Sequence, residues 1–314
     1  MMDTKADFVV GVNYPWRHYG QDFGTSAWGH RGFSSAPLEV QADFERIRSA
    51  FEPWPTVVVR VFIFADGRCS PEFGDSGEVV GFDDFFYPDF DAMLEAATRS
   101  DVRLIPALLD FHWCYPAGEV NGVKIAGRSN VICDPELRAS FLERALTPLL
   151  ERYDAHPSIF AWEVINEPEW ALKLGLLRRW SKAKVDPAHV RVFIRECAEL
   201  IHRKTAQRVT VGSARPNWVR LWTDAGLDFH QCHWYLGWLR MILTRLRGSP
   251  ARQEAGCLIG EAPSAGARTS PIEYLRKAQA QGYTGLLFWS FRAADRYTNF
   301  DNVAAALSAW KEGK

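Results

Sequence analysis

The alternation of short apolar runs with longer amphipathic stretches constrains the fold of this chain more than any other feature. Eight strand-like runs lie at 8–14, 56–64, 102–110, 159–166, 208–214, 228–235, 257–262 and 284–291. Strands that alternate with helices form parallel sheets, and continuous Val, Ile, Leu and Phe runs are typical of strands covered on both faces. The pattern predicts an α/β fold, a single (β/α)8 TIM barrel, as one domain over residues 1–314.

Helix starts support this count. A capping residue precedes proline at Asp134, Asp186 and Ser270. The segment after Asp186 carries apolar residues at helical spacing and is expected to cover the barrel wall; they are Val190, Phe193, Ile194, Cys197, Leu200 and Ile201. The connection 215–227 is short, so the fifth unit is expected to have only a very short helix.

Charge and composition exclude several function classes. With 37 Lys and Arg against 38 Asp and Glu the net charge is -1, so no overall field favours nucleic acid. The apolar runs are far shorter than the roughly 20 residues that a membrane-spanning helix needs. Tryptophan is abundant, with 13 residues beside 9 Tyr, and flat aromatic faces suit stacking on sugar rings. Most of these rings are nevertheless expected in the core.

The cysteines indicate neither a zinc site nor a disulfide scaffold, because no two have C-x-x-C spacing; they are Cys69, Cys114, Cys133, Cys197, Cys232 and Cys257. Reduced thiols in a cytoplasmic protein are the simplest interpretation, with a Cys114–Cys133 bridge as an alternative. Because the first strand begins at Phe8, no export signal is expected in this sequence.

Two glutamates are placed for chemistry. Glu167 follows the fourth apolar run and Glu261 lies near the end of the seventh. Catalytic residues of (β/α)8 enzymes gather at the carboxyl ends of the strands. Cleavage of a glycosidic bond needs one carboxylic acid to protonate the leaving oxygen and one carboxylate to meet the oxocarbenium-like carbon. Glu167 and Glu261 are therefore predicted to form a catalytic carboxylate pair.

Further polar and aromatic residues lie at or near the strand ends. The set comprises Asn13, Tyr14, Trp16, Arg60, Asp110, His112, Trp113, Asn166, Trp218, His233, Tyr235, Trp289 and Arg292. A single polar residue at a strand end does not indicate a function. So many polar and aromatic residues at the carboxyl ends of the strands are, however, hard to explain by core packing. Their convergence predicts a polar, aromatic-lined site around the two glutamates.

In these motifs the chain resembles a clan A retaining glycoside hydrolase, and it is most similar to glycoside hydrolase family 5. The resemblance covers the whole chain and rests on Asn166-Glu167-Pro168 after strand four, Glu261 on strand seven, His233-x-Tyr235 on strand six, Arg60, His112 and Trp289. It implies that Glu167 is the acid/base and Glu261 the nucleophile. Ala262-Pro263 departs from the aromatic residue and glycine that more usually follow the nucleophile. No metal or cofactor is implied.

Chemistry suggests a role for each neighbour. Arg60 and Tyr235 are expected to hold the charge of Glu261, which in turn raises the pKa of Glu167. Asn166 is expected to bind the sugar 2-OH, and His233 to tune Glu167. His112 and Trp113 are expected to contact or support the sugar, and Trp289 to form the floor beneath the reacting sugar, with Trp113, Trp170 and Trp234 as substitutes.

The predicted substrate is an oligosaccharide of a β-linked glycan of mannan or glucan type, since AWEVINEP at 161–168 resembles the mannanases. A second interpretation is an enzyme or transglycosylase that acts on glycolipids, suggested by the apolar and basic stretches 169–184 and 238–248. These stretches are better explained as a groove wall and a barrel helix. A third is a carbohydrate-binding barrel without catalysis, which the two intact glutamates argue against.

Several charged residues have structural explanations. Glu163 is on the same side of strand four as Glu167 but deeper, where an ion pair inside the barrel is expected. Asp66 and Asp110 are equally explained as anchors for loops. Arg292 can pair with Asp295.

Overall fold

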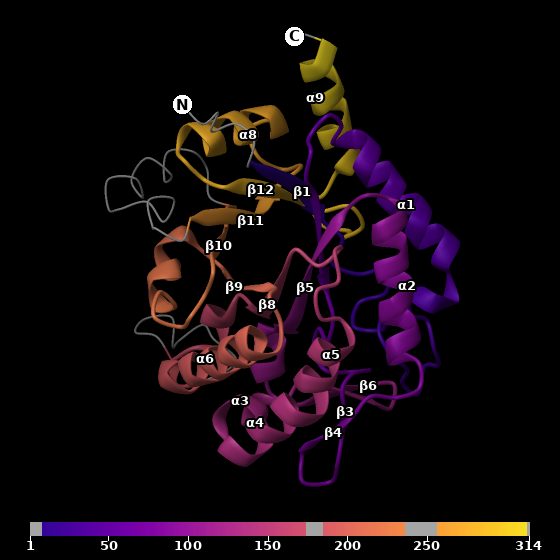
Figure 1. Ribbon diagram of the computed structural model, residues 1–314, viewed down its shortest axis with the longest axis vertical. Coiled ribbons are helices and arrows are strands. Elements are labelled where there is room, and N and C mark those ends of the chain that lie inside the picture. The colour runs from indigo at the N-terminus through magenta and orange to yellow at the C-terminus, as the bar shows by residue number, and fades with distance from the viewer. Residues whose placement is uncertain (1–7, 174–184, 236–255, 313–314) are drawn as a thin grey trace.

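Eight parallel strands close into a barrel in the computed structural model, which describes residues 8–173, 185–235 and 256–312 (Figure 1). All eight predicted strands are present, and the (β/α)8 prediction is confirmed. In chain order they are β1 (Val9–Asn13), β2 (Val57–Phe62), β5 (Arg103–Asp110), β8 (Ala161–Asn166), β9 (Arg208–Ser213), β10 (His230–His233), β11 (Cys257–Pro263) and β12 (Gly285–Trp289).

Pairing around the barrel follows chain order, and β12 returns to pair with β1. Every neighbouring pair is parallel, so all carboxyl ends open at one mouth. The register sets Asn13 beside Arg60 and His233 beside Glu261. Candidate side chains far apart in sequence therefore meet at the same level of the barrel.

Helices surround the strands in Figure 1 and bury their apolar faces against them. They are α1 (Pro37–Ala50), α2 (Phe86–Arg99), α3 (Ser129–Cys133), α4 (Pro135–Phe141), α5 (Thr147–Arg152), α6 (Pro187–Lys204), α8 (Pro271–Ala280) and α9 (Phe300–Glu312), with a π-helical turn η3 (Leu142–Leu146) between α4 and α5. The three predicted caps are present: Asp134 and Asp186 accept backbone N–H groups, and Ser270 forms a capping box with Glu273. As predicted, the apolar residues of α6 are buried.

Short elements fill the connections at the mouth. They are the 3-10 turns η1 (Phe33–Ser35), η2 (Phe111–Cys114), η4 (Pro168–Ala171) and η6 (Pro216–Leu221), and the hairpins β3 (Glu72–Phe73) with β4 (Val79–Gly81) and β6 (Gly118–Val120) with β7 (Val123–Ile125). The short η6 is the helical element described in the fifth unit, as expected. Both hairpins follow the carboxyl end of a barrel strand, so they lie at the mouth of the barrel.

Of the two roles predicted for Trp113, contact with the sugar or support, burial excludes direct contact. Its side chain is fully buried and packs against Phe64, Phe73 and Phe141. Successive residues of a 3-10 turn point in different directions, so η2 directs His112 to the mouth and Trp113 into the core. Trp113 can therefore support the loop only from below.

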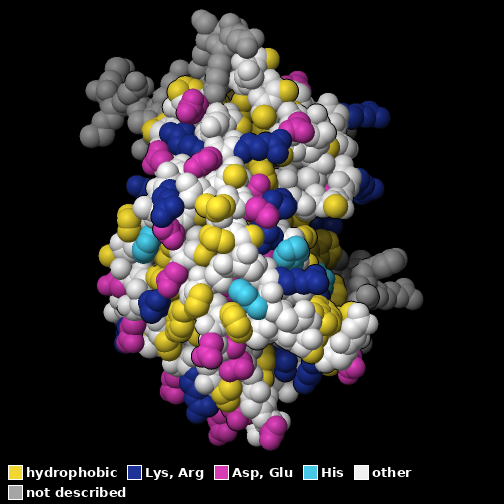
Figure 2. All heavy atoms as spheres, turned by 90° about the vertical axis from the view of Figure 1, so that its right-hand side faces the viewer, with side chains coloured by type: hydrophobic (Ala, Val, Ile, Leu, Met, Phe, Trp, Pro, Cys, Tyr) yellow, Lys and Arg dark blue, Asp and Glu magenta, His cyan; other side chains and the backbone are white. Residues whose placement is uncertain are grey.

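All six cysteines are free thiols, and the alternative Cys114–Cys133 bridge is absent. Among the described residues, none of the helices has the length and apolarity to cross a bilayer. Basic and acidic side chains are interspersed over the face shown in Figure 2, in keeping with the near-zero net charge. The cytoplasmic location stays a prediction.

Candidate active site

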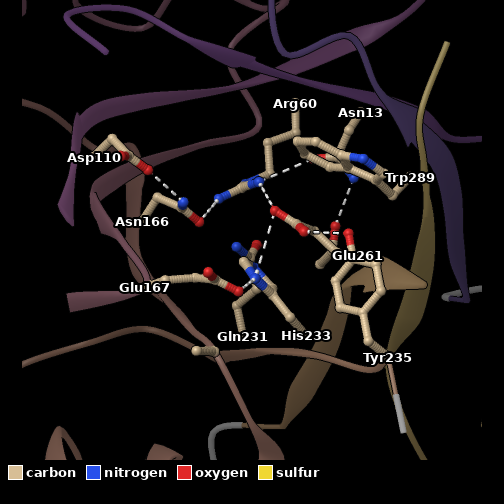
Figure 3. A network of polar contacts seen from close by, with 12 residues as sticks. Asn13, Arg60, Asp110, Asn166, Glu167, Gln231, His233, Tyr235, Glu261 and Trp289 are labelled. Carbon is tan, nitrogen blue, oxygen red and sulfur yellow. Dashed lines mark hydrogen bonds and ion pairs between the residues drawn. The ribbon is translucent and has the colours of Figure 1, made fainter. Parts of the chain in front are cut away.

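A cavity of about 420 Å³ opens at the carboxyl ends of the strands. Nine of the residues predicted at the strand ends line it: Trp16, Asp110, His112, Asn166, Glu167, His233, Tyr235, Glu261 and Trp289. Arg60 lies behind the wall and reaches Glu261 from within the barrel. Figure 3 shows Glu261, Tyr235 and Trp289 on one side of this group and Asp110, Asn166 and Glu167 on the other.

The two glutamates face each other across the cavity. An oxygen of Glu167 and an oxygen of Glu261 lie within 4.8 Å of one another. Carboxyl groups of retaining glycosidases are about 5–5.5 Å apart, whereas inverting enzymes leave room for a water molecule at about 6.5–9.5 Å. The separation therefore favours direct attack by one of the two carboxylates.

Glu261 is held from three sides. Arg60 Nη1 lies 2.8 Å from Glu261 Oε1, and Tyr235 donates its hydroxyl to Oε2 at 2.6 Å, so both predicted contacts are present. His233 Nδ1 lies 3.4 Å from Oε1. Burial raises the pKa of Glu261, while His233, Arg60 and the Tyr235 hydrogen bond oppose that rise. Because burial also raises the pKa of Tyr235, its phenol stays protonated and remains a donor.

Arg60 is fixed by a fully buried fork. Its Nε and Nη2 each lie 2.6 Å from an oxygen of Glu163, which also accepts from Gln231 at 2.8 Å. Glu163 thus forms the ion pair inside the barrel that its depth on the strand predicted. At neighbouring Gly212 a Cβ would lie 2.4 Å from Glu163 Oε1, so only glycine leaves space for this pair.

Arg60 also orders two amides. Its guanidinium donates to Asn13 Oδ1 at 2.9 Å and to Asn166 Oδ1 at 2.7 Å. Asn166 Nδ2 in turn donates to Asp110 at 2.6 Å. The side-chain oxygen of Asn166 is thereby assigned as the acceptor for Arg60, and its orientation at the mouth is fixed.

Glu167 directly follows β8 and has a left-handed backbone conformation with φ of +45°. Non-glycine residues rarely adopt this conformation, which costs on the order of 1–3 kcal/mol and is concentrated at functional sites. Here it turns the chain sharply from the strand into η4. The carboxylate meets His233 Nδ1 at 2.7 Å and the indole N–H of Trp170 at 2.8 Å.

Burial and then the negative charge of Asp110 raise the pKa of Glu167 to about 7, while the Trp170 hydrogen bond opposes the rise. A raised pKa for Glu167 was expected from the sequence, but the negative charge of Glu261 was expected to cause it, whereas burial and Asp110 are the main causes. Glu261 is compensated by Arg60 and Tyr235, which leaves desolvation as the main cause. Glu167 is thus partly protonated near neutral pH.

His233 is neutral at physiological pH. Its side chain is fully buried, and this burial lowers its pKa to about 4. In a neutral imidazole, each ring nitrogen either accepts or donates a hydrogen bond, depending on the tautomer. Nδ1 can therefore accept a hydrogen bond from protonated Glu167 or donate one to ionised Glu167. The position between both carboxylates suits the predicted tuning of Glu167.

His112 is partly exposed at the rim. Burial disfavours its charged form, but the hydrogen bond and the negative charge of Asp110 outweigh this effect and raise the pKa of His112. Asp110 also accepts the backbone N–H of His112 at 3.0 Å. Asp110 therefore anchors its loop and joins the site network, while Asp66 forms a fork with Arg68.

Aromatic residues form the walls of the cavity. Trp289 is half-buried, donates its indole N–H to Asp295 at 2.7 Å and packs edge-on against Trp16 at 6.0 Å. Arg292 does not take Asp295 as its partner; it pairs with Asp43 at 2.7 Å. Because Asp295 is engaged by Trp289, it orients the ring predicted to form the floor.

Sequence reasoning missed Phe62, which ends β2, and several lining residues that come from loops: Tyr19, Arg215, Asp295 and Tyr297. Arg215 packs on Trp170 and Trp218, with its guanidinium carbon 5.4 and 4.8 Å from the ring centroids. Loop residues carry no periodic signal, so only the abundance of aromatic residues pointed to them.

Glu167, His233 and Glu261 are also the one group of His, Cys, Asp or Glu in the described ranges whose ligand atoms could surround a metal ion. Arg60 already lies 2.8 Å from Glu261, however, and His233 is within hydrogen-bonding distance of Glu167. These atoms satisfy one another with hydrogen bonds and an ion pair. The arrangement is therefore better explained by proton transfer than by metal binding.

No protein-family model matches the chain. The chain shares its TIM-barrel fold with solved β-mannanases and with a GH5_18 protein from Streptomyces cattleya.

Among curated proteins, the chain is 27% identical to a mannan endo-1,4-beta-mannosidase from Cryptopygus antarcticus, over 93% of this chain and 83% of the relative. The crystal structure of beta-1,4-D-mannanase from that organism has a TM-score of 0.76 at 23% identity, covering 97% of this chain and 90% of the other. An endo-1,4-beta-mannanase from Eisenia fetida also has a TM-score of 0.76, at 22% identity and 96% and 90% coverage.

Proposed function

We propose that this protein is a retaining β-glycoside hydrolase that cleaves β-1,4-linked glycans of the mannan type by double displacement. The observation that carries the proposal is the approach of Glu167 and Glu261 within 4.8 Å, with opposite chemical surroundings. Glu261 accepts hydrogen bonds from the guanidinium of Arg60 and the hydroxyl of Tyr235, whereas the pKa of Glu167 is raised to about 7. The mannanase names of the relatives support the substrate class.

In the first step Glu261 attacks the anomeric carbon of the sugar while the bond to the leaving oxygen breaks. Glu167 donates its proton to that oxygen, and the aglycone departs as an alcohol. The negative charge of Glu261 is consumed in the new ester bond. Arg60 and Tyr235 hold the carboxylate in position, which reduces the reorganisation needed for attack.

In the second step Glu167, now ionised, removes a proton from a water molecule. The water oxygen attacks the anomeric carbon, the ester bond breaks, and Glu261 leaves as a carboxylate. Two inversions give a product with the β configuration of the substrate. His233, neutral and 2.7 Å from Glu167, can respond to both protonation states during the cycle.

The proposal is tested by proton NMR during hydrolysis of β-1,4-manno-oligosaccharides and β-1,4-gluco-oligosaccharides of equal length. We expect faster cleavage of the mannan series and initial release of the β-anomer, before mutarotation. First appearance of the α-anomer would exclude the retaining mechanism. Faster cleavage of the glucan series would exclude mannan as the preferred substrate while leaving the mechanism intact.

Truncation of Trp289 to alanine is expected to lower kcat/KM. The ring lines the cavity on the strand next to Glu261, and its loss removes a large apolar contact with the sugar under attack. We expect about 2–3 kcal/mol less transition-state binding and little change in thermal stability, since the ring faces the open mouth. An unfolded variant whose surviving fraction has normal kinetics would place Trp289 in the core. Trp170 would then be the remaining candidate, because Trp234 is buried like Trp113.

The pH profile of kcat/KM is expected to fall on the alkaline side near pH 7. The first step needs protonated Glu167, whose pKa is about 7, so activity is lost as the pH rises through that value. On the acidic side activity falls as Glu261 becomes protonated, at a pH above the usual range for glutamate because its pKa is also raised.

Two variants are expected to move the alkaline limb in opposite directions. Trp170→Phe removes a hydrogen bond that favours ionised Glu167, so its pKa and the limb should rise by about one unit. Asp110→Asn removes a negative charge that raises the same pKa, so the limb should move down. Shifts in the same direction would show that another group controls this limb.

A glycolipid substrate is a weaker alternative. The stretch 238–248 lies outside the described residues, and 169–184 is described only as far as Lys173. An assay with detergent-solubilised β-glycolipids compares this alternative with mannan directly. A barrel that only binds carbohydrate would turn over neither substrate.

A further inference from the structure

A second cavity of about 460 Å³ lies outside the catalytic pocket and is lined by Gln21, Trp28, Arg31, Val120 and Asn121. One wall is the connection after β1, and the other is the turn of the β6–β7 hairpin. Both segments follow the carboxyl ends of barrel strands. The cavity therefore opens on the same end of the barrel as Glu167 and Glu261.

We propose that this cavity is a distal sugar-binding subsite, which holds units of the glycan chain remote from the bond that is cleaved. The proposal rests on the proposed function, because its ligand is the other end of the same substrate.

Trp28 is held in a fixed orientation. Its indole N–H donates to the backbone oxygen of Asn121 at 3.1 Å, and the guanidinium carbon of Arg68 lies 5.5 Å from the centre of the ring. Arg68 is itself fixed by Asp66 through bonds of 2.8 and 2.7 Å. A ring whose position is already determined loses little conformational freedom when a sugar stacks on it.

The two cavities are joined by a series of rings. The guanidinium of Arg68 also covers Tyr19 at 4.7 Å. Tyr19 lines the catalytic pocket and packs edge-on against Trp16 at 4.9 Å, and Trp16 packs against Trp289 at 6.0 Å. A continuous series of side-chain contacts thus links Trp289, which lines the catalytic pocket, to Trp28.

The polar groups of this cavity suit a neutral sugar. Gln21 and Asn121 offer amides, and Gln21 Oε1 is buried with no hydrogen-bond partner in the described part of the chain, so it can accept from a hydroxyl. Its lining contains no carboxylate and one cationic residue, Arg31. A flat ring with amides at its edge binds the apolar face and the hydroxyls of a pyranose together.

The test compares the wild type with Trp28→Ala and Gln21→Ala on β-1,4-manno-oligosaccharides of increasing length and on polymeric mannan. Phe85→Ala is the matched control, since this aromatic side chain is 42% exposed and lines neither cavity. For Trp28→Ala we expect kcat/KM to fall about tenfold on long substrates and to stay unchanged on the shortest ones. Gln21→Ala should show the same length dependence, and Phe85→Ala should show none.

An equal loss on all lengths would overturn the proposal, because Trp28 would then act by shaping the catalytic pocket through Arg68 and Tyr19. No loss on any substrate would overturn it as well. A wild type that cleaves none of the series would instead contradict the proposed function. Titration calorimetry then tests the subsite independently of turnover. It compares the affinity of Glu261→Gln for mannohexaose and mannan fragments with that of the double variant that also carries Trp28→Ala. Equal affinities would exclude the subsite.

Discussion

Glu261→Ala is expected to lower turnover of every β-glycoside by at least about 10⁴-fold, because the variant has no group that can form the covalent intermediate. Added azide should restore activity, since it fits the space left by the carboxylate and attacks the same face of the sugar. One displacement then replaces two, so the product should be the inverted, α-configured glycosyl azide. NMR of the azide product checks both statements.

The residues around Glu261 determine whether the Glu261→Ala variant still folds and binds substrate. Its removal leaves Arg60 with Glu163, Asn13 and Asn166 as partners, so the guanidinium stays compensated inside the barrel. We therefore expect the variant to fold and to keep its affinity for oligosaccharides. A β-configured azide product from Glu261→Ala would show that the nucleophile is a different residue.

Glu167→Ala should behave differently. Loss of the acid should lower kcat/KM on natural linkages by about 10²–10⁴-fold, while dinitrophenyl glycosides, whose leaving group needs no proton, should lose much less. The second step then lacks its base, so the covalent intermediate should accumulate. Azide should release it from the opposite face and give the β-configured azide. Steady-state kinetics on both substrates, with NMR of the product, distinguish this variant from Glu261→Ala.

Glu169 provides the matched control. It is a buried glutamate two residues away that accepts from the backbone N–H of Ala214 at 3.0 Å and from Trp222 at 2.7 Å, and it does not line the cavity. Glu169→Gln keeps an acceptor for one of these groups and should leave the ratio of activities on the two substrate types unchanged. If both variants lose the two activities equally, Glu167 has no specific role as an acid.

The barrel could be predicted because its strands and helices leave periodic signals, and because parallel pairing places all strand ends at one mouth. The same logic placed Arg60 and Tyr235 beside Glu261, where the structure has them. Alternation placed Glu163 and Glu167 on the same side of the fourth strand, and the deeper position of Glu163 predicted its ion pair inside the barrel.

The remaining features depend on three-dimensional surroundings that sequence does not encode locally. The inward direction of Trp113 depends on the 3-10 turn η2, which the apolar pattern does not predict. Arg292 meets Asp43, which is remote in sequence. The main cause of the raised pKa of Glu167 is desolvation, which depends on how the loops close over the site. Tyr19 and Tyr297 reach the cavity from such loops.

The central claim, covalent catalysis through Glu261, is tested most directly by trapping. A 2-deoxy-2-fluoro-β-mannosyl fluoride slows both steps by destabilising the oxocarbenium-like transition state, while its reactive leaving group lets the first step proceed. Mass spectrometry of the intact protein should show one added fluorosugar, and peptide mapping should place it on Glu261. A label on another residue, or turnover of the reagent with no adduct and with α-configured product, would contradict the mechanism.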